Sequence, residues 1–116
     1  MSEGYNGYPN RATWLCQLWI DNEEPTQKKF EEIVQNTYDQ CIHENGEIDV
    51  VKFIYHVALE IRGWVIEQID TQVLSSSGLV VDLLAGALEE INYQYLANLY
   101  LQGEIENRHF KIKETK

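Results

Sequence analysis

Apolar residues recur at helical spacing along most of the chain, and its first half contains two predicted helices. Residues 1–9 are polar and contain Asn6-Gly7 and Pro9, which predict a loop. Residues 11–21 follow as a helix capped by Asn10, with Trp14 and Trp19 on its core face. Residues 26–44 give the clearest amphipathic helix, because its apolar face continues at positions i, i+3, i+4, i+7, i+8 and i+11. That face consists of Phe30, Ile33, Val34, Thr37, Tyr38 and Cys41.

A third helix is predicted over residues 49–72. Asn45-Gly46 ends the preceding helix, and Asp49 can cap the new one. Its apolar stripe is wide, with Val51, Leu59 and Ile66 lying beside it. We therefore expect a central helix that is buried on more than one side.

A last long helix is predicted over residues 78–102, between the Ser75–Gly78 breaker and Gly103. Residues 104–116 then form a short charged tail. The pattern leaves three forms open for it: a strand over 109–113, a frayed end, or an arm packed on the bundle. The core residues expected from all four helices are Trp14, Phe30, Phe53, Ile61, Trp64, Leu84, Leu88 and Ile91.

Two glycines lie inside predicted helices, Gly63 and Gly86. Glycine there is less favourable than alanine by roughly 1 kcal/mol. We expect each to allow a close approach between the third and fourth helices or to leave room for an indole ring, rather than to line a ligand pocket.

The fold class that follows is all-α: a compact bundle of about four helices, with an N-terminal loop and the short tail, in a single domain over residues 1–116. A chain of 116 residues with 44% hydrophobic residues can form one core without staples. We therefore expect Cys16 and Cys41 to be buried, reduced thiols.

The charge excludes several classes of partner. The net charge is -10, so nucleic acid and anionic lipid should be repelled, and we expect no direct nucleic-acid or membrane binding. No basic segment followed by an apolar run opens the chain, and no apolar stretch reaches ~18 residues. The expected location is the cytoplasm.

Catalytic and metal-binding patterns are not found in the sequence. His56 and Glu60 lie four residues apart, and Cys41 is two residues from His43, but neither pair has the further ligands that a metal site needs. Cys16 lies near the tryptophan stripe, where a thiol is desolvated rather than activated. We expect no catalytic, cofactor-binding or metal-binding residues, and no enzymatic activity.

Acidic residues are concentrated between positions 23 and 49, where eight of them stand against two lysines. One interpretation is a solvated helix face that keeps the protein soluble. The other is a surface for a basic protein, since carboxylates spaced along a helix can replace phosphates. The candidate partner-binding residues are Glu23, Glu24, Glu31, Glu32 and Asp39, with Tyr5 and Tyr8 in the loop ahead of the first helix.

Two strings resemble a family of small uncharacterised proteins of phages, plasmids and bacterial genomes. Residues 5–22 resemble its opening motif YNGW-N-TW---LW-DN, and residues 81–93 resemble its later motif DLL--AL-E(I/V)NW. Tyr8 and Tyr93 stand where that pattern has tryptophan. The resemblance implies a mobile-element setting but brings no activity with it.

Two functional hypotheses follow. In the first, the protein is a non-enzymatic inhibitor or adaptor whose acidic face occupies a basic, nucleic-acid-binding groove on a host protein. The mobile-element setting extends this to host defence complexes such as CRISPR effectors. In the second, it is a homo-oligomeric structural or accessory phage protein whose aromatic surfaces pair with copies of itself. Salt separates the two, because a charge-driven complex weakens with ionic strength and an apolar interface does not.

Overall fold

The structure is a computed structural model that describes residues 6–73 and 86–114, and these residues form an all-α bundle, as the sequence predicts. The helices are α1 (Arg11–Asn22), α2 (Glu24–Cys41), α3 (Val50–Val73) and α5 (Tyr93–Glu114), with a short helical stretch at residues 86–89. None of the helices in these two ranges is long and apolar enough to cross a membrane.

A single extended residue, Glu23, joins α1 to α2. The first turn of α1 is capped as predicted, since the side-chain oxygen of Asn10 accepts a hydrogen bond from the Thr13 N–H at 2.8 Å. Pro25 lies in the first turn of α2, where its missing N–H leaves no hydrogen bond unmade. The two helices therefore follow one another with no loop between them.

Helix α2 ends at Cys41, three residues before the predicted boundary at 44. Ile42 is extended and forms an isolated antiparallel bridge with Ile48. Between them the His43 N–H donates to the Glu47 carbonyl at 2.7 Å, and Gly46 adopts a φ of +90°, which favours glycine. The backbone of residues 42–44 therefore follows this tight turn instead of continuing the helix. Helix α3 then starts at the predicted cap, with the Lys52 N–H donating to Asp49 Oδ1 at 3.1 Å.

The prediction of one last helix over 78–102 is wrong in its second half, and residues 78–85 lie outside the described part. The helical stretch at 86–89 stops in a turn, and α5 begins at Tyr93 behind Asn92, whose Oδ1 accepts from the Tyr95 N–H at 2.9 Å. Gly103 does not end the helix, because α5 continues to Glu114. Residues 104–114 are thus helix, neither strand nor frayed tail.

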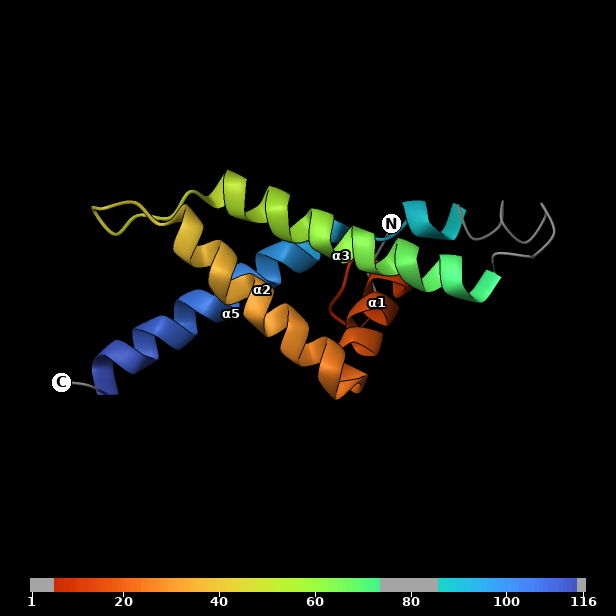
Figure 1. The fold of residues 1–116 in the computed structure, drawn as a ribbon, viewed down its shortest axis with the longest axis horizontal. Coiled ribbons are helices and arrows are strands. Elements are labelled where there is room, and N and C mark those ends of the chain that lie inside the picture. The colour runs from red at the N-terminus through yellow and green to blue at the C-terminus, as the bar shows by residue number, and fades with distance from the viewer. Residues whose placement is uncertain (1–5, 74–85, 115–116) are drawn as a thin grey trace.

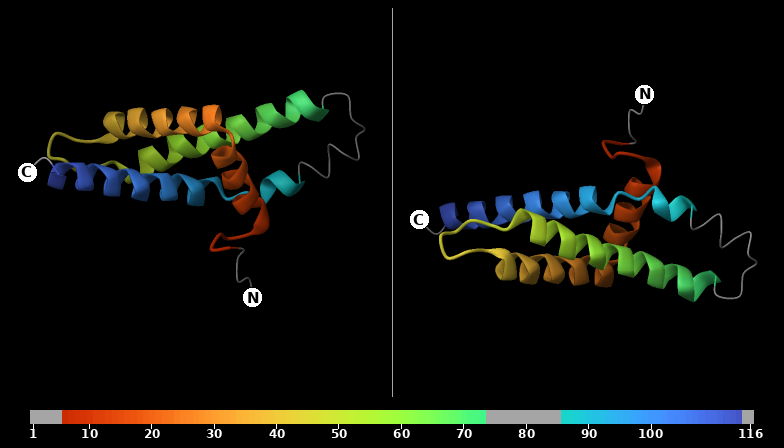
Figure 2. Two further views of the ribbon diagram at one scale, coloured as in Figure 1. Left: turned by 90° about the horizontal axis from the view of Figure 1, so that it is seen from below. Right: turned by 90° about the horizontal axis from the view of Figure 1, so that it is seen from above.

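Three long helices, α2, α3 and α5, pack together, and the shorter α1 lies across them near one end (Figure 1). Figure 2 shows α2 and α5 both running alongside α3, which contacts each of them. The core lies among the long helices and is closed at one end by α1. The buried apolar residues are Cys16, Ile20, Phe30, Val34, Tyr38, Cys41, Phe53, Val57, Ile61, Val65, Leu96, Ala97 and Leu101.

Most of the predicted core is confirmed. Phe30, Phe53 and Ile61 are fully buried. Of the remainder, Trp64, Leu88 and Ile91 are partly buried against that core, Trp14 is half-buried, and Leu84 lies outside the described residues. The Phe30 ring meets Trp64 edge-on at 6.1 Å and stacks on Tyr100 at 6.3 Å, so one side chain connects α2, α3 and α5.

Two expectations about burial are wrong. Trp19 is 58% exposed, because α1 crosses the bundle and only part of its apolar face is covered. Val51 and Leu59 of α3 are also exposed, so this helix is buried on one side only. The two glycines do not mediate close helix contacts either, since a Cβ at Gly63 or Gly86 would meet nothing within 4 Å.

Candidate protein-binding surfaces

The acidic residues of α2 are exposed, as expected, but they are divided over two sides of the helix. Glu24 forms an ion pair with Lys28 at 3.1 Å, within the same helix. Glu31 lines a hollow of about 320 Å³ between α2 and α5, whereas Glu32 lines a shallow one beside Lys28 and Lys29. The carboxylates therefore do not form one continuous acidic face.

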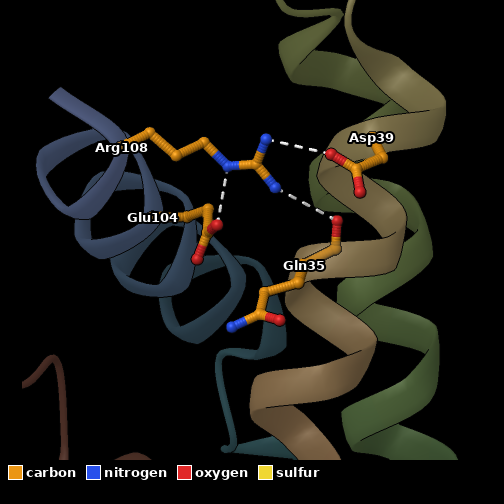
Figure 3. Close-up of polar contacts among 4 residues, drawn as sticks. All are labelled: Gln35, Asp39, Glu104 and Arg108. Carbon is orange, nitrogen blue, oxygen red and sulfur yellow. Dashed lines mark hydrogen bonds and ion pairs between the residues drawn. The ribbon is translucent and has the colours of Figure 1, made fainter. Parts of the chain in front are cut away.

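Asp39 forms an ion pair with Arg108 of α5, a residue that the sequence pattern assigned to the C-terminal tail (Figure 3). Arg108 Nη1 lies 2.9 Å from Asp39 Oδ1, and its Nε lies 2.7 Å from the buried Glu104 carboxylate. Its Nη2 also donates to the Gln35 carbonyl at 3.4 Å, and the guanidinium lies 4.2 Å above the Tyr38 ring. Asp39 thus fastens α5 to α2, and only part of it remains available to a partner.

The two strings that carried the family resemblance meet in space, at the start of α1 and the break before α5. Thr13 Oγ1 is buried; it donates to Asn10 Oδ1 at 2.7 Å and accepts from the Asn92 N–H at 2.9 Å. Asn10 Nδ2 donates to the Glu90 carbonyl at 2.6 Å. We call these four residues the polar clasp. It supplies partners for backbone groups that the helix break would leave unpaired.

The N-terminal loop is fastened to the same place. Its turn at Asn6-Gly7 has positive φ at both residues, and the Tyr95 hydroxyl donates to the Gly7 carbonyl at 2.8 Å. The Tyr8 ring packs edge-on against Tyr95 at 5.8 Å. Burial, followed by the charge of Asp21 and by Tyr95, raises the pKa of Tyr8. Tyr8 therefore holds the loop to α5 rather than projecting toward a partner, and Tyr5 lies outside the described residues.

A groove runs between the outer side of α3 and residues 89–94, which lead from the short helical stretch into α5. One hollow of about 480 Å³ is lined on the α3 side by Tyr55, Ala58, Leu59 and Arg62. Its opposite wall is residues 89–94, and Asn10 of the polar clasp closes it. The sequence pattern did not predict this groove. The spacing of Val51, Tyr55 and Leu59 at i, i+4 and i+8 was the available signal.

A second apolar hollow, of about 580 Å³, lies between α1, α3 and residues 87–91. Trp19 and Trp64 stand on its walls, and Cys16 is at its base. Burial raises the pKa of the Cys16 thiol to about 12. Cys41 is likewise a free, buried thiol, which agrees with the sequence-based expectation.

We expect Cys16 to resist alkylation in the folded protein. Its thiol stays protonated at pH 8, and the thiolate is the reactive form. Iodoacetamide followed by mass spectrometry should find Cys16 unmodified in native protein and modified in urea. Rapid labelling of the native protein would contradict the burial of this thiol.

Stability should also fall at alkaline pH. The folded pKa of Cys16 is raised from 9.0 to about 12, so its contribution is complete below the unfolded value and is lost as pH rises toward the folded one. Melting temperatures across pH 8 to 11 should show this decline. The Cys16→Ala variant is the control, because its decline should be shallower.

In the part of the chain that the structure describes, no third ligand joins either of the two residue pairs with metal-ligand spacing. His56 and Glu60 are exposed on α3, with the His56 ring against Tyr55, and Cys41 is buried whereas His43 is exposed. Within residues 6–73 and 86–114, no group of three or more histidine, cysteine or acidic side chains is placed to hold a metal ion.

Residues 1–61 match the model of a family described only as a family of unknown function (DUF7249). The match contains the string at residues 5–22, α2 and the first half of α3. The second string, at residues 81–93, lies beyond it. No curated protein and no solved structure matches the chain.

Proposed function

The chain belongs to this family of unknown function, and because the family brings no activity, we propose from the surfaces alone that the protein is a small non-enzymatic module that binds a positively charged protein surface. The observation that carries the proposal is the exposure of Glu31 and Glu32 on α2. Neither takes part in the ion pairs that the described residues form. In a chain of net charge -10, such carboxylates favour a basic partner.

The proposal extends to the setting of that interaction. Small acidic proteins of mobile elements act on host machinery, and carboxylates along a helix can replace phosphates in a basic nucleic-acid-binding groove. We therefore propose a host-cell cytoplasmic protein, encoded by a phage or plasmid, that inhibits a host defence complex such as a CRISPR effector. The resemblance of the strings at residues 5–22 and 81–93 supports only the mobile-element setting in this proposal, and it brings no activity with it.

The structure changes which carboxylates should be tested. Reversing Asp39 would place a lysine against Arg108 and disturb the contact between α2 and α5. The double variant Glu31→Lys/Glu32→Lys avoids this. Glu44→Lys/Glu47→Lys is its matched control, because both residues are exposed in the turn after α2 and the change in net charge is identical.

We expect tagged wild-type protein to retain a basic protein from host lysate that the Glu31/Glu32 variant loses and the Glu44/Glu47 variant keeps. With that protein purified, binding should weaken steeply between low and high salt, since charge attraction is screened. Equal retention by both variants would overturn the acidic surface as the binding site. Salt-insensitive self-association as the sole interaction would support the homo-oligomeric alternative instead.

A further inference from the structure

The outer side of α3 carries an apolar stripe that no element of the described residues covers. Val51 is 80% exposed, Tyr55 61% and Leu59 46%. Their spacing of four residues places them on one face, which Arg62 and Ile66 continue toward the end of the helix. Large exposed apolar patches mark interaction sites in soluble proteins.

The stripe forms one wall of the groove introduced above. A second hollow, of about 370 Å³, adjoins the first and shares Arg62, Glu89, Ile91 and Tyr93 with it. Together the two hollows extend along α3 from Tyr55 to Ile66. The eleven steps from Tyr55 to Ile66 measure about 16 Å, which is the length of roughly three helical turns. The groove is therefore long enough to hold a helix.

The charged residues that line the groove indicate what kind of partner helix it would bind. Glu89 and Glu90 are exposed on the wall opposite the stripe, against the single guanidinium of Arg62. A second copy of this chain would add its own net charge of -10 to the complex. Charge complementarity therefore favours a helix with basic residues.

Gly63 supplies a separate indication of a partner on this side of α3. It lies in mid-helix, four residues after Leu59 and three before Ile66, and so shares their face. It is exposed, and a Cβ there would meet nothing within 4 Å, so no contact among the described residues accounts for this unfavourable residue. The backbone of a partner helix can approach most closely where a side chain is missing.

We propose that the groove between α3 and residues 88–94 binds an amphipathic helix of the partner protein. The apolar side of that helix lies on Tyr55 and Leu59, and its basic residues reach Glu89 and Glu90. This is the helix-in-groove mode of recognition. The inference rests on the proposed function and adds a second surface to it, distinct from α2.

The test uses a labelled synthetic helix of about 18 residues, or five turns, with leucines on one side and lysines on the other. Binding to the full chain is measured by fluorescence anisotropy. We expect Tyr55→Ser and Leu59→Ser each to weaken binding by about tenfold, as for central interface residues. Ile42→Ser is the matched control, because Ile42 is 40% exposed in the turn after α2, away from the groove and from the hollow that Glu31 lines, and its effect should be less than about twofold.

Two further variants test the chemistry of the site. Glu89→Lys/Glu90→Lys should weaken binding of the lysine helix and improve binding of the same helix with glutamates in place of the lysines. Gly63→Ala should raise the melting temperature while weakening binding, a combination that a purely structural glycine would not produce.

Several outcomes would overturn the inference. If Leu59→Ser and Ile42→Ser bind alike while Glu31→Lys/Glu32→Lys loses the peptide, the groove is excluded and the proposed function stands. If the basic peptide binds at neither surface and no basic protein is retained from lysate, both fail. A large loss of melting temperature in Leu59→Ser without any partner, relative to Ile42→Ser, would show that another part of this chain covers the stripe. If the wild type forms a dimer and Leu59→Ser abolishes that dimer, the stripe binds a second copy of this chain instead.

Discussion

Replacing Phe30 by alanine should lower the free energy of unfolding by about 3–5 kcal/mol, the range for large aromatic truncations in cores. Phe30 is buried where α2, α3 and α5 meet, and its ring contacts Trp64 and Tyr100. The surrounding side chains relax only partly into such a gap, so a cavity remains. Urea unfolding followed by circular dichroism measures the effect, and small domains have only about 5–15 kcal/mol to lose.

Two variants keep this prediction interpretable. Phe30→Leu retains part of the packing and should unfold at a urea concentration between those of wild type and alanine variant. Tyr55→Ala removes an aromatic ring from the exposed side of α3 and should change stability by no more than about 0.5 kcal/mol. Equal effects of Phe30→Ala and Tyr55→Ala would contradict the core described here.

The α2 face was predictable because its pattern is local and repeated. Phe30, Val34, Thr37, Tyr38 and Cys41 are all buried. When a helix packs along one side, the apolar stripe in its own sequence shows which side faces the core. Trp19 lies on an equally regular stripe but is exposed. Its exposure depends on the angle at which α1 crosses the bundle, and the spacing of residues within α1 does not reveal that angle.

The break before α5 could not be predicted from periodicity. Apolar residues continue at helical spacing from Leu88 through Leu99, on both sides of Asn92. The turn there depends on hydrogen bonds to Asn10 and Thr13, about 80 residues away in sequence. Contacts over such distances override local propensity.

In the candidate sites, too, the features set by local sequence pattern were predictable and those set by contacts between distant segments were not. Exposure of Glu31 and Glu32 followed from their position beside the apolar stripe of α2. The engagement of Asp39 did not, because Arg108 reaches it only when residues 104–114 are helical and α5 packs against α2. The α3 groove could not be predicted, because exposed apolar side chains such as Val51 and Leu59 have the same sequence pattern as those in a core.

Replacing Thr13 by valine should lower the free energy of unfolding by about 2–3 kcal/mol. Thr13 is 0% exposed, and valine keeps its shape while removing the hydroxyl. The Asn92 N–H then loses its acceptor at the point where α5 begins, and Asn10 loses one donor. A buried donor left unsatisfied is unfavourable by roughly 1–3 kcal/mol. Urea unfolding measures the change, and faster hydrogen exchange at the Asn92 amide should locate it in the polar clasp.

The controls separate the hydrogen bonds from the packing. Thr13→Ser keeps the hydroxyl and loses one buried methyl, so it should destabilise by roughly 0.8 kcal/mol and leave exchange at Asn92 unchanged. Thr26→Val removes a hydroxyl whose contact with Glu23 is long, at 3.4 Å and exposed, and should have little effect. If Thr13→Val is as stable as wild type, the helix break does not depend on the clasp, and the two strings of the family resemblance need another physical explanation.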